Sequence, residues 1–339
     1  MQKLNTIETL RGIAALLVVV FHATQFTAML YSKPLHNIFM FGYAGVEFFF
    51  VLSGFIIFYS HSKDIGNPSK ISIYLKKRFI RIFPLFWLIT LCSLIINYFV
   101  PIDFLVFTDE PIKVLKSLSL YLQEDREPVL GVAWTLKTEV YFYLIFALLI
   151  LNRKLGAIIL IFWTFYNINA ITICFLLGFF ANQALNLKIK NPKFIAYFGI
   201  ILFLSVGIYN NHHTNSVFLY LYDIASVLII TGFCHLEMNN AVKVPAFLTR
   251  IGSATYSIYL MHYGTMAIIS HWKYPVITEY HLSNMYFFIL IISGIISGLV
   301  VNKYIEIPLL NYLRKKLLLK KEALIILDAK NRLPLKSEI

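Results

Sequence analysis

Residues 10–30 read LRGIAALLVVVFHATQFTAML, an apolar run that contains one arginine, Arg11, and one histidine, His22. A helix needs about 20 mostly apolar residues to cross a hydrocarbon core about 30 Å thick. This run is long enough to cross, and it is not followed by the small-residue cleavage site that is typical of a signal peptide. It therefore predicts a retained transmembrane helix.

The composition of the whole chain agrees with a protein that lies largely in a membrane. Of its 339 residues, 59% are hydrophobic and 14% are charged, against about 45–50% and about 25% in soluble globular proteins. The net charge of +13 would suggest nucleic acid for a soluble protein, but in a membrane protein the position of the cations matters more than their sum. We therefore expect no nucleic-acid partner. The three scattered cysteines argue against a disulfide framework or a metal site.

Apolar runs of the same kind recur along the chain and predict an all-α integral membrane protein, a bundle of about ten transmembrane helices. The predicted spans are Leu10–Leu30, Tyr43–Ser60, Ile82–Val100, Ala133–Leu151, Leu155–Tyr166, Ile168–Leu185, Phe194–Tyr209, Val217–His235, Gly252–Trp272 and Asn284–Tyr304. The fifth span is short and abuts the sixth, so nine is the alternative count.

Positive charge favours ten spans over nine. With ten spans and a cytoplasmic N-terminus, 24 of the 30 Lys and Arg residues fall in cytoplasmic segments and 5 in outer segments, which follows the positive-inside rule. Nine spans would place the basic C-terminal end outside. The sequence thus predicts that both termini are cytoplasmic, with a transmembrane domain at 1–312 and a basic tail at 313–339. The long outer loop, 101–132, is expected to hold short surface structure of its own.

Ionisable side chains inside the spans are costly and are therefore candidates for function. Arg11 and His22 are separated by about three helical turns, or about 16 Å, so they share one face of the first span. Glu47, Glu139 and His262 are expected at a depth similar to that of His22, in the outer half of the bilayer. A histidine beside a carboxylate can act as a general base with an orienting partner. A set of structural buried ion pairs is the alternative.

Arginines gather at the cytoplasmic mouth of the third span. Arg78 and Arg81 are three residues apart and share a helix face, and arginine is the side chain best suited to bidentate contacts with phosphate. Glu306, at the end of the last span, is placed to pair with one of them. Plain positive-inside topology is the alternative explanation, and it accounts for the neighbouring lysines better than for this spacing.

Six stretches in order along the chain resemble the acyltransferase 3 family of bacterial membrane O-acyltransferases, in particular its stand-alone, exopolysaccharide acetylase-like members. They are ETLRGIAA at 8–15 followed by His22, GVEFFFVLSGF at 45–55, RFIRIFP at 78–84, WTLKTE at 134–139, YSIYLMH at 256–262 and EIP at 306–308. Two positions depart from the usual pattern of the family, because Glu47 stands where Asp is usual and Thr135 where Ser is usual.

The resemblance implies a membrane-bound O-acyltransferase, most often an O-acetyltransferase, in a bacterial inner (cell) membrane. It implies cytoplasmic acyl-CoA, commonly acetyl-CoA, as the donor substrate, with no bound cofactor. The implied acceptor is a hydroxyl of a cell-surface polysaccharide or of its lipid-linked precursor. The arginine–histidine and paired-arginine motifs of the family map onto Arg11 with His22 and onto Arg78 with Arg81.

The residues and the resemblance together predict one site. They assign catalysis to His22, Glu47 and Glu139, donor binding to Arg11, Arg78, Arg81 and Glu306, and substrate contacts to Trp134, Tyr256 and His262. In this hypothesis His22, oriented by one of the two glutamates, deprotonates the acceptor hydroxyl or is itself transiently acylated. The sequence leaves both routes open.

A transporter or flippase for a lipid-linked saccharide is the rival reading, because a helical bundle with ionisable groups at mid-depth suits it equally on composition. A third reading is a non-catalytic membrane partner in a glycan-synthesis complex. The paired arginines beside the Arg11–His22 face favour a protein that uses CoA.

Overall fold

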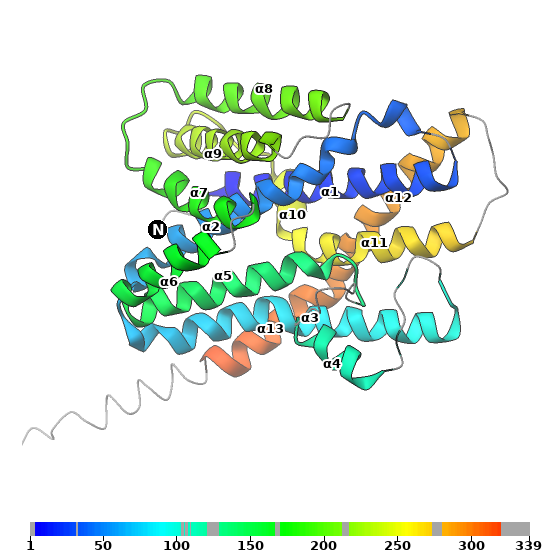
Figure 1. Ribbon diagram of the computed structural model, residues 1–339, viewed down its shortest axis with the longest axis horizontal. Coiled ribbons are helices and arrows are strands. Elements are labelled where there is room, and N and C mark those ends of the chain that lie inside the picture. Colours follow the sequence, from blue (N-terminus) through cyan, green and yellow to red (C-terminus); the bar gives the residue numbers. More distant parts are fainter. Residues whose placement is uncertain are drawn as a thin grey trace, which may run out of the picture.

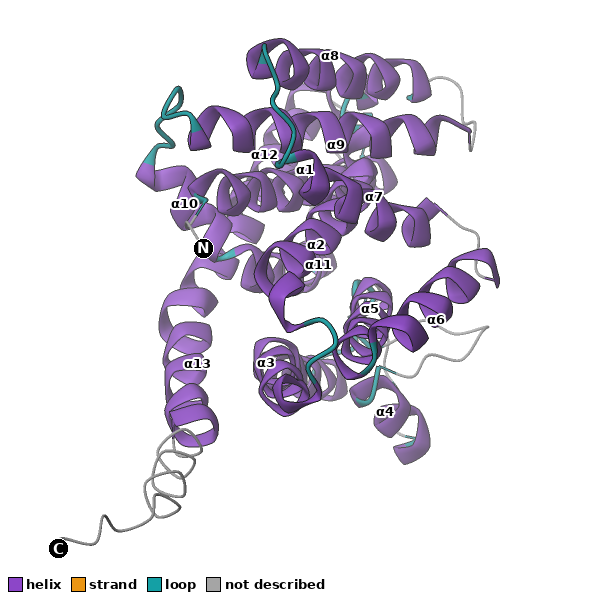
Figure 2. Cartoon of the chain, turned by 90° about the vertical axis from the view of Figure 1, so that its left-hand side faces the viewer, coloured by secondary structure: helices purple, strands orange, loops and turns teal. Residues whose placement is uncertain are grey.

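The computed structural model describes residues 4–31, 33–102, 105, 108, 110–120, 129–166, 170–211, 217–272 and 280–319, and within these ranges the chain forms helices and no strand (Figures 1 and 2). The α-helices are α1 (Asn5–Leu30), α2 (Gly45–His61), α3 (Ile71–Phe99), α4 (Pro111–Leu118), α5 (Ala133–Leu151), α6 (Arg153–Tyr166), α7 (Ala170–Ala184), α8 (Pro192–Asn210), α9 (Val217–Met238), α10 (Ala246–Ser253), α11 (Thr255–His271), α12 (Tyr280–Val301) and α13 (Ile307–Arg314).

Each predicted span coincides with one of these helices, and the all-α integral membrane fold is confirmed. In the part of the chain that the structure describes, seven helical segments are long and apolar enough to cross a membrane. The other three predicted spans correspond to α6, α7 and α11, which have 14, 15 and 17 residues. The count of ten and the side on which the termini lie stay predictions. The start of the sixth predicted span, Ile168, and the tail beyond residue 319 lie outside the described residues.

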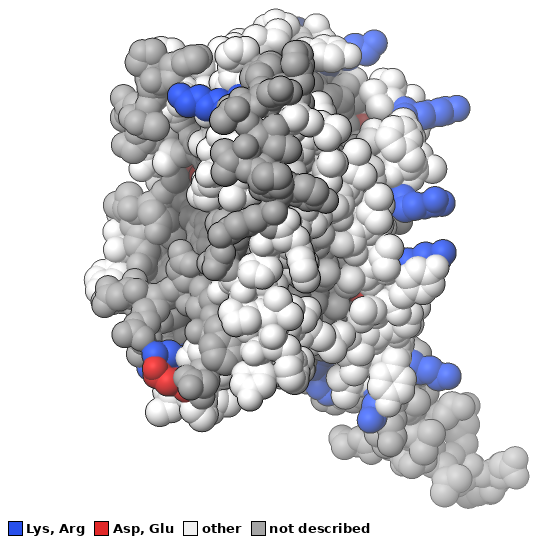
Figure 3. Space-filling view, turned by 90° about the vertical axis from the view of Figure 1, so that its right-hand side faces the viewer, with Lys and Arg blue, Asp and Glu red and all other residues white. Residues whose placement is uncertain are grey.

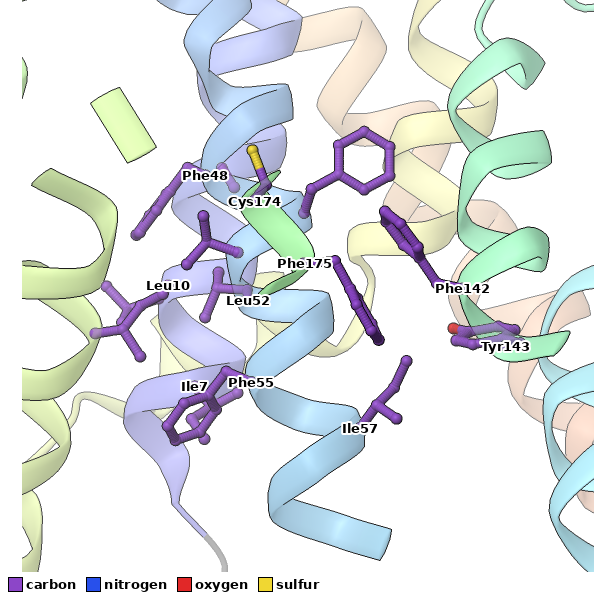
Figure 4. Packing of buried hydrophobic residues seen from close by; sticks show 14 of the residues in the cluster. Ile7, Leu10, Phe48, Leu52, Phe55, Ile57, Phe142, Tyr143, Cys174 and Phe175 are labelled. Atoms are coloured by element: carbon purple, nitrogen blue, oxygen red, sulfur yellow. The ribbon is translucent and has the colours of Figure 1, made fainter. Parts of the chain in front are cut away.

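Helix α1 occupies the centre of the bundle and packs against α2, α9, α10, α11 and α12. Figure 1 shows the α8–α9 pair on one side of α1 and α3, α5 and α13 on the other. The core between α2, α5 and α7 is rich in aromatic rings, and Phe142 stacks on Phe175 with ring centroids 4.3 Å apart (Figure 4). The apolar helices thus bury one another around the helix that carries Arg11 and His22.

Two glycines set how closely the helices approach. A Cβ on Gly252 of α10 would lie 1.9 Å from the backbone oxygen of Glu8 in α1, and one on Gly54 of α2 would lie 2.4 Å from the backbone oxygen of Phe175 in α7. Any larger residue would push these helix pairs apart, because backbone meets backbone at both crossings. The small residues of α2 therefore serve helix packing.

The start of α1 is fixed by a residue from a distant part of the chain. The backbone N–H groups of Asn5 and Thr6 donate to the two carboxylate oxygens of Glu237, each at 2.8 Å. A carboxylate there satisfies two amides that have no partner within the helix and complements the positive end of the helix dipole. The end of α9 is in this way tied to the beginning of α1.

The helix does not end after α12 but continues as a wider turn. Residues 302–306 form a π-helical turn between α12 and α13, and both Asn302 and Glu306 are buried there. Such turns insert an extra residue into a helix and occur frequently at functional sites. The widened turn directs Asn302 and Glu306 toward α3 and α11.

The outer loop contains α4, so the expected short surface structure is present. The ninth predicted span begins at Gly252, but the helix breaks at Ala254, and the amphipathic α10 precedes it. Figure 3 views the end of the bundle opposite the start of α1, and uncharged side chains cover most of the described surface there.

Candidate active site

Two groups of polar side chains lie along the face of α1 that carries Arg11 and His22. A histidine pair lies toward the C-terminal end of α1, and an arginine cluster lies toward its N-terminal end. Helices α3, α5, α11 and the turn after α12 supply the partners.

His22 of α1 and His262 of α11 form the histidine pair, with ring centroids 5.3 Å apart. The Nδ1 atom of His22 is 3.2 Å from Oε1 of Gln25. An amide oxygen can only accept, so this contact places the proton on Nδ1 and leaves the lone pair on Nε2. Tyr263 packs edge-on against the His22 ring at 5.2 Å.

His262 is completely buried. Its Nδ1 donates to the backbone oxygen of Ile258 at 3.1 Å, and its Nε2 has no hydrogen-bond partner. The neutral ring therefore presents a second unpartnered acceptor nitrogen beside His22. A buried acceptor without a donor is costly, and a hydroxyl group bound between the rings would satisfy it.

The arginine cluster is centred on Glu306, whose carboxylate accepts three hydrogen bonds. Arg81 donates to Oε1 at 3.0 Å, and Ser257 and Asn302 donate to Oε2 at 2.6 and 2.8 Å. The side chain of Glu306 is 2% exposed, whereas that of Arg81 is 24% exposed. The carboxylate therefore anchors the arginine while part of the guanidinium stays accessible.

Arg78 and Arg11 complete this cluster. The guanidinium carbon of Arg78 lies 4.9 Å from the ring centroid of Tyr143, within the range of a cation–π interaction, and its Nε has no hydrogen-bond partner. Tyr143 in turn donates a hydrogen bond to Glu139. Arg11 lies close enough to Arg81, Glu139 and Glu306 to interact with all three charges.

A narrow cavity lies between the two groups along α1. Its walls come from α1 between Arg11 and His22, from the start of α2, from α5 at Glu139, and from α11 at Tyr256 and Tyr259. The ring of Tyr259 is 5.7 Å from that of His262. The cavity has a volume of about 30 Å³, which is room for about one water molecule. Side chains along it must therefore move before a larger group can pass.

The structure thus brings together most of the predicted site residues. Arg11, Arg78, Arg81, Glu139, Tyr256 and Glu306 form the arginine cluster, and the guanidinium carbon of Arg81 lies 5.5 Å from the ring centroid of Tyr256. Neither Glu47 nor Glu139 is hydrogen-bonded to His22; the residue in that place is Gln25. Trp134 is 43% exposed at the start of α5.

Glu47 belongs to a different polar group, which we call the α2–α9 acidic centre (Glu47, Cys174 and Asp223). Cys174 of α7 donates through its thiol to Oδ1 of Asp223 at 3.0 Å. Oδ2 of Asp223 and Oε2 of Glu47 are buried and have no hydrogen-bond partner. The two carboxylates are near enough to repel each other. Donors are therefore scarce in this centre.

Some residues of the site escaped sequence reasoning. Gln25 follows His22 by three residues, so the helical i, i+3 relation could have indicated it. Asn302 precedes Glu306 by four residues and could have been found in the same way. Tyr143 follows Glu139 by four residues on α5 and could also have been found in this way. Ser257 comes from another helix, and nothing in its local sequence points to the carboxylate of Glu306 that it contacts.

The fold and the site define a multi-pass membrane protein with a buried polar centre that joins an arginine cluster to a histidine pair. A family model described as an acyltransferase domain matches residues 4–303, nearly the whole chain. The chain therefore belongs to the acyltransferase 3 family and is a membrane acyltransferase. Comparison with curated proteins and with solved structures gave no match.

Proposed function

We propose that this protein is an O-acyltransferase that takes an acyl group, most often acetyl, from cytoplasmic acyl-CoA. The acceptor is a hydroxyl of a cell-surface polysaccharide or of its lipid-linked precursor, and the reaction takes place in a bacterial inner membrane. One observation carries the proposal: a single helix, α1, bears Arg11 in the arginine cluster and His22 in the histidine pair, with a cavity along the same face.

The arginine cluster suits the phosphates of CoA. Guanidinium groups bind phosphate oxygens through paired hydrogen bonds, and Arg11, Arg78 and Arg81 offer three of them near one another. Glu306 holds Arg81 in one orientation, so less side-chain freedom is lost when the phosphate binds. With the phosphates there, the extended pantetheine arm of CoA would follow the cavity toward the histidine pair.

The histidine pair suits the transfer step. Nε2 of His22 accepts the proton of the acceptor hydroxyl while the hydroxyl oxygen attacks the thioester carbonyl carbon. A carbon–oxygen bond forms, the carbon–sulfur bond breaks, and His22 returns the proton to the thiolate, which leaves as the CoA thiol. Gln25 holds the tautomer that this step needs. Nε2 of His262 is free to accept a hydrogen bond from a second hydroxyl of the saccharide.

The protein reconstituted in lipid nanodiscs with acetyl-CoA and a saccharide acceptor tests the proposal through release of the CoA thiol. His22→Ala should lower turnover about 10²–10⁴-fold, the usual worth of a general base. His36→Asn, a change at an exposed histidine in the loop before α2, is the matched control and should retain turnover. Full turnover in His22→Ala would refute the assignment, and transport of an intact saccharide without thiol release would favour the rival reading.

Two further variants separate binding from chemistry. Arg81→Ala should raise the KM for acetyl-CoA more than it lowers kcat, because it removes a phosphate contact. An unchanged dependence on acetyl-CoA concentration would contradict its role. Gln25→Glu places a negative charge beside Nδ1 of His22 and stabilises the imidazolium, so the acid limb of the pH–rate profile should move to higher pH. A covalent acyl-His22 trapped by rapid quenching would identify the acyl-enzyme route.

A further inference from the structure

An apolar groove lies on the opposite side of α1 from the active-site cavity, between α1, α8, α9 and the segment 242–248. It has a volume of about 400 Å³, within the range of small-molecule pockets. Its lining is almost entirely hydrocarbon, with Leu10, Ile13, Ile200, Phe203 and Phe233 among its walls. Figure 4 shows two of its side chains, Leu10 and Phe48, projecting to the same side.

Helix α1 separates this groove from the reactive groups. Leu10, Ile13 and Leu17 line the groove, and their spacing places them in one stripe of the helix. The stripe that carries Arg11 and His22 is rotated from it by more than about 100°, at 100° per residue. A molecule in the groove therefore contacts the face of α1 that carries Leu10, Ile13 and Leu17 and does not reach the histidine pair.

Two lysines lie near the end of the groove that is closest to the start of α1. Thr6 and Thr9 line the groove at this end, and their buried hydroxyls have no hydrogen-bond partner. Lys193 precedes Ile200 by seven residues on α8, which is about two turns along the same helix face. Lys243 lies between two lining residues and is exposed. The carboxylate of Glu237, which lies at this end, accepts hydrogen bonds from the backbone N–H groups of Asn5 and Thr6.

We propose that the groove binds one hydrocarbon chain of an anionic membrane phospholipid. The chain fills the space between the apolar walls, and the two lysines attract the negative headgroup. The rim is lipid-facing, because Ile201 and Phe247 beside it are 61% and 62% exposed. The exposed lysines near one end of an apolar slot favour a lipid with a negative headgroup over a helix of a second copy, which would bring no matching negative charge to that end. The proposal does not depend on the proposed reaction.

Native mass spectrometry of the protein, exchanged into micelles with equal phosphatidylglycerol and phosphatidylcholine of identical chains, tests this site. The wild-type chain should retain one phosphatidylglycerol. Ile200→Trp fills the groove and should lower the retained fraction at least 10-fold. Ile201→Trp, its neighbour on the lipid-facing side, is the matched control and should retain the lipid. Replacing both Lys193 and Lys243 by Gln should abolish the preference for the anionic lipid.

Equal retention by wild type and Ile200→Trp would overturn the proposal, as would equal retention of the two lipids by the wild type. A wild-type dimer without lipid, dissociated by Ile200→Trp, would show that a second copy fills the groove, and this too would overturn it. If Ile200→Trp fails to fold, Ile13→Phe narrows the slot from the opposite wall. Intrinsic tryptophan fluorescence during heating establishes that each variant is folded.

Discussion

Glu306 and the α2–α9 acidic centre are buried in opposite ways. Around Glu306, one carboxylate receives hydrogen bonds from Arg81, Ser257 and Asn302. In the α2–α9 acidic centre, two carboxyl groups share the interior, and one oxygen of each has no donor. The first carboxylate has a countercharge beside it, whereas in the second centre one carboxyl lies near another. Both are enclosed by apolar helices.

The difference shows what burial demands of a carboxylate. A buried charge is tolerable when a countercharge and hydrogen bonds replace the lost water. Glu306 meets that demand and so holds Arg81 in place for a ligand. Glu47 and Asp223 do not meet it, so their centre weakens the fold that contains it. The following variants test this contrast, in order of decreasing effect.

Removing Glu306 should have the largest effect. Glu306→Ala leaves the Arg81 charge without its counterion and removes the acceptor of two further donors, at a cost of about 3–5 kcal/mol. The melting temperature, followed by tryptophan fluorescence in detergent, should fall by several degrees, and the KM for acetyl-CoA should rise. Glu306→Gln keeps the shape and is the control, with a smaller loss. A melting temperature unchanged by Glu306→Ala would contradict the contrast.

Removing one donor to Glu306 should have an intermediate effect. Ser257→Ala deletes the hydroxyl that lies 2.6 Å from Oε2 but keeps the Arg81 pair, and a hydrogen bond to a charged group is worth about 1.5–3 kcal/mol. The unfolding midpoint should fall less than in Glu306→Ala. Ser257→Thr retains the hydroxyl and serves as its control. A loss as large as that of Glu306→Ala would mean that the arginine is not the main partner.

Replacing Glu47 should act in the other direction. Glu47→Gln substitutes one of two neighbouring buried carboxyl groups without changing the volume, and its amide adds donors where donors are scarce. We expect a gain of about 1 kcal/mol in the free energy of unfolding, measured as a higher melting temperature. The same substitution at Glu306 should lower it. A loss in Glu47→Gln equal to that in Glu306→Gln would erase the distinction between the two centres.

Changing the thiol of the second centre should have the smallest effect. Cys174→Ser keeps a donor toward Oδ1 of Asp223, so the melting temperature should change by the equivalent of less than about 1 kcal/mol. Cys174→Ala removes the only donor that Asp223 has among the described residues, and it should cost about 1 kcal/mol more than Cys174→Ser. Equal values for the two variants would show that the thiol contributes no hydrogen bond.

Most of the long helices could be predicted from the sequence to within a few residues, because each is an apolar run with polar ends. Helix α3 is an exception, since it begins at Ile71, 11 residues before the predicted Ile82, and its first turns carry the basic stretch 76–81. The break between α10 and α11 could not be predicted, since Gly252 reads as the start of an apolar run. Its close approach to Glu8 depends on a helix that lies more than 200 residues earlier. Local periodicity carries no information about that crossing.

The candidate site was predictable only where it follows one helix. The spacing of Arg11 and His22 on α1 follows from helical periodicity. The placement of Glu47 could not be foreseen, because depth in the membrane says nothing about which neighbours surround a side chain. The sequence placed Glu47 level with His22, whereas the fold turns it toward Asp223 of α9. Partners contributed by other helices can be identified only once the packing of the bundle is known.

The carboxylate at the start of α1 also has a consequence for the time course of assembly. Glu237 lies 232 residues after Asn5, to which it accepts a hydrogen bond. At a synthesis rate of about 5–20 residues per second, roughly 10–50 s pass between the two. Throughout that interval the first backbone N–H groups of the helix that bears Arg11 and His22 lack the carboxylate of Glu237. This helix is thus synthesised first, and Glu237 can cap its start only after α9 has been synthesised.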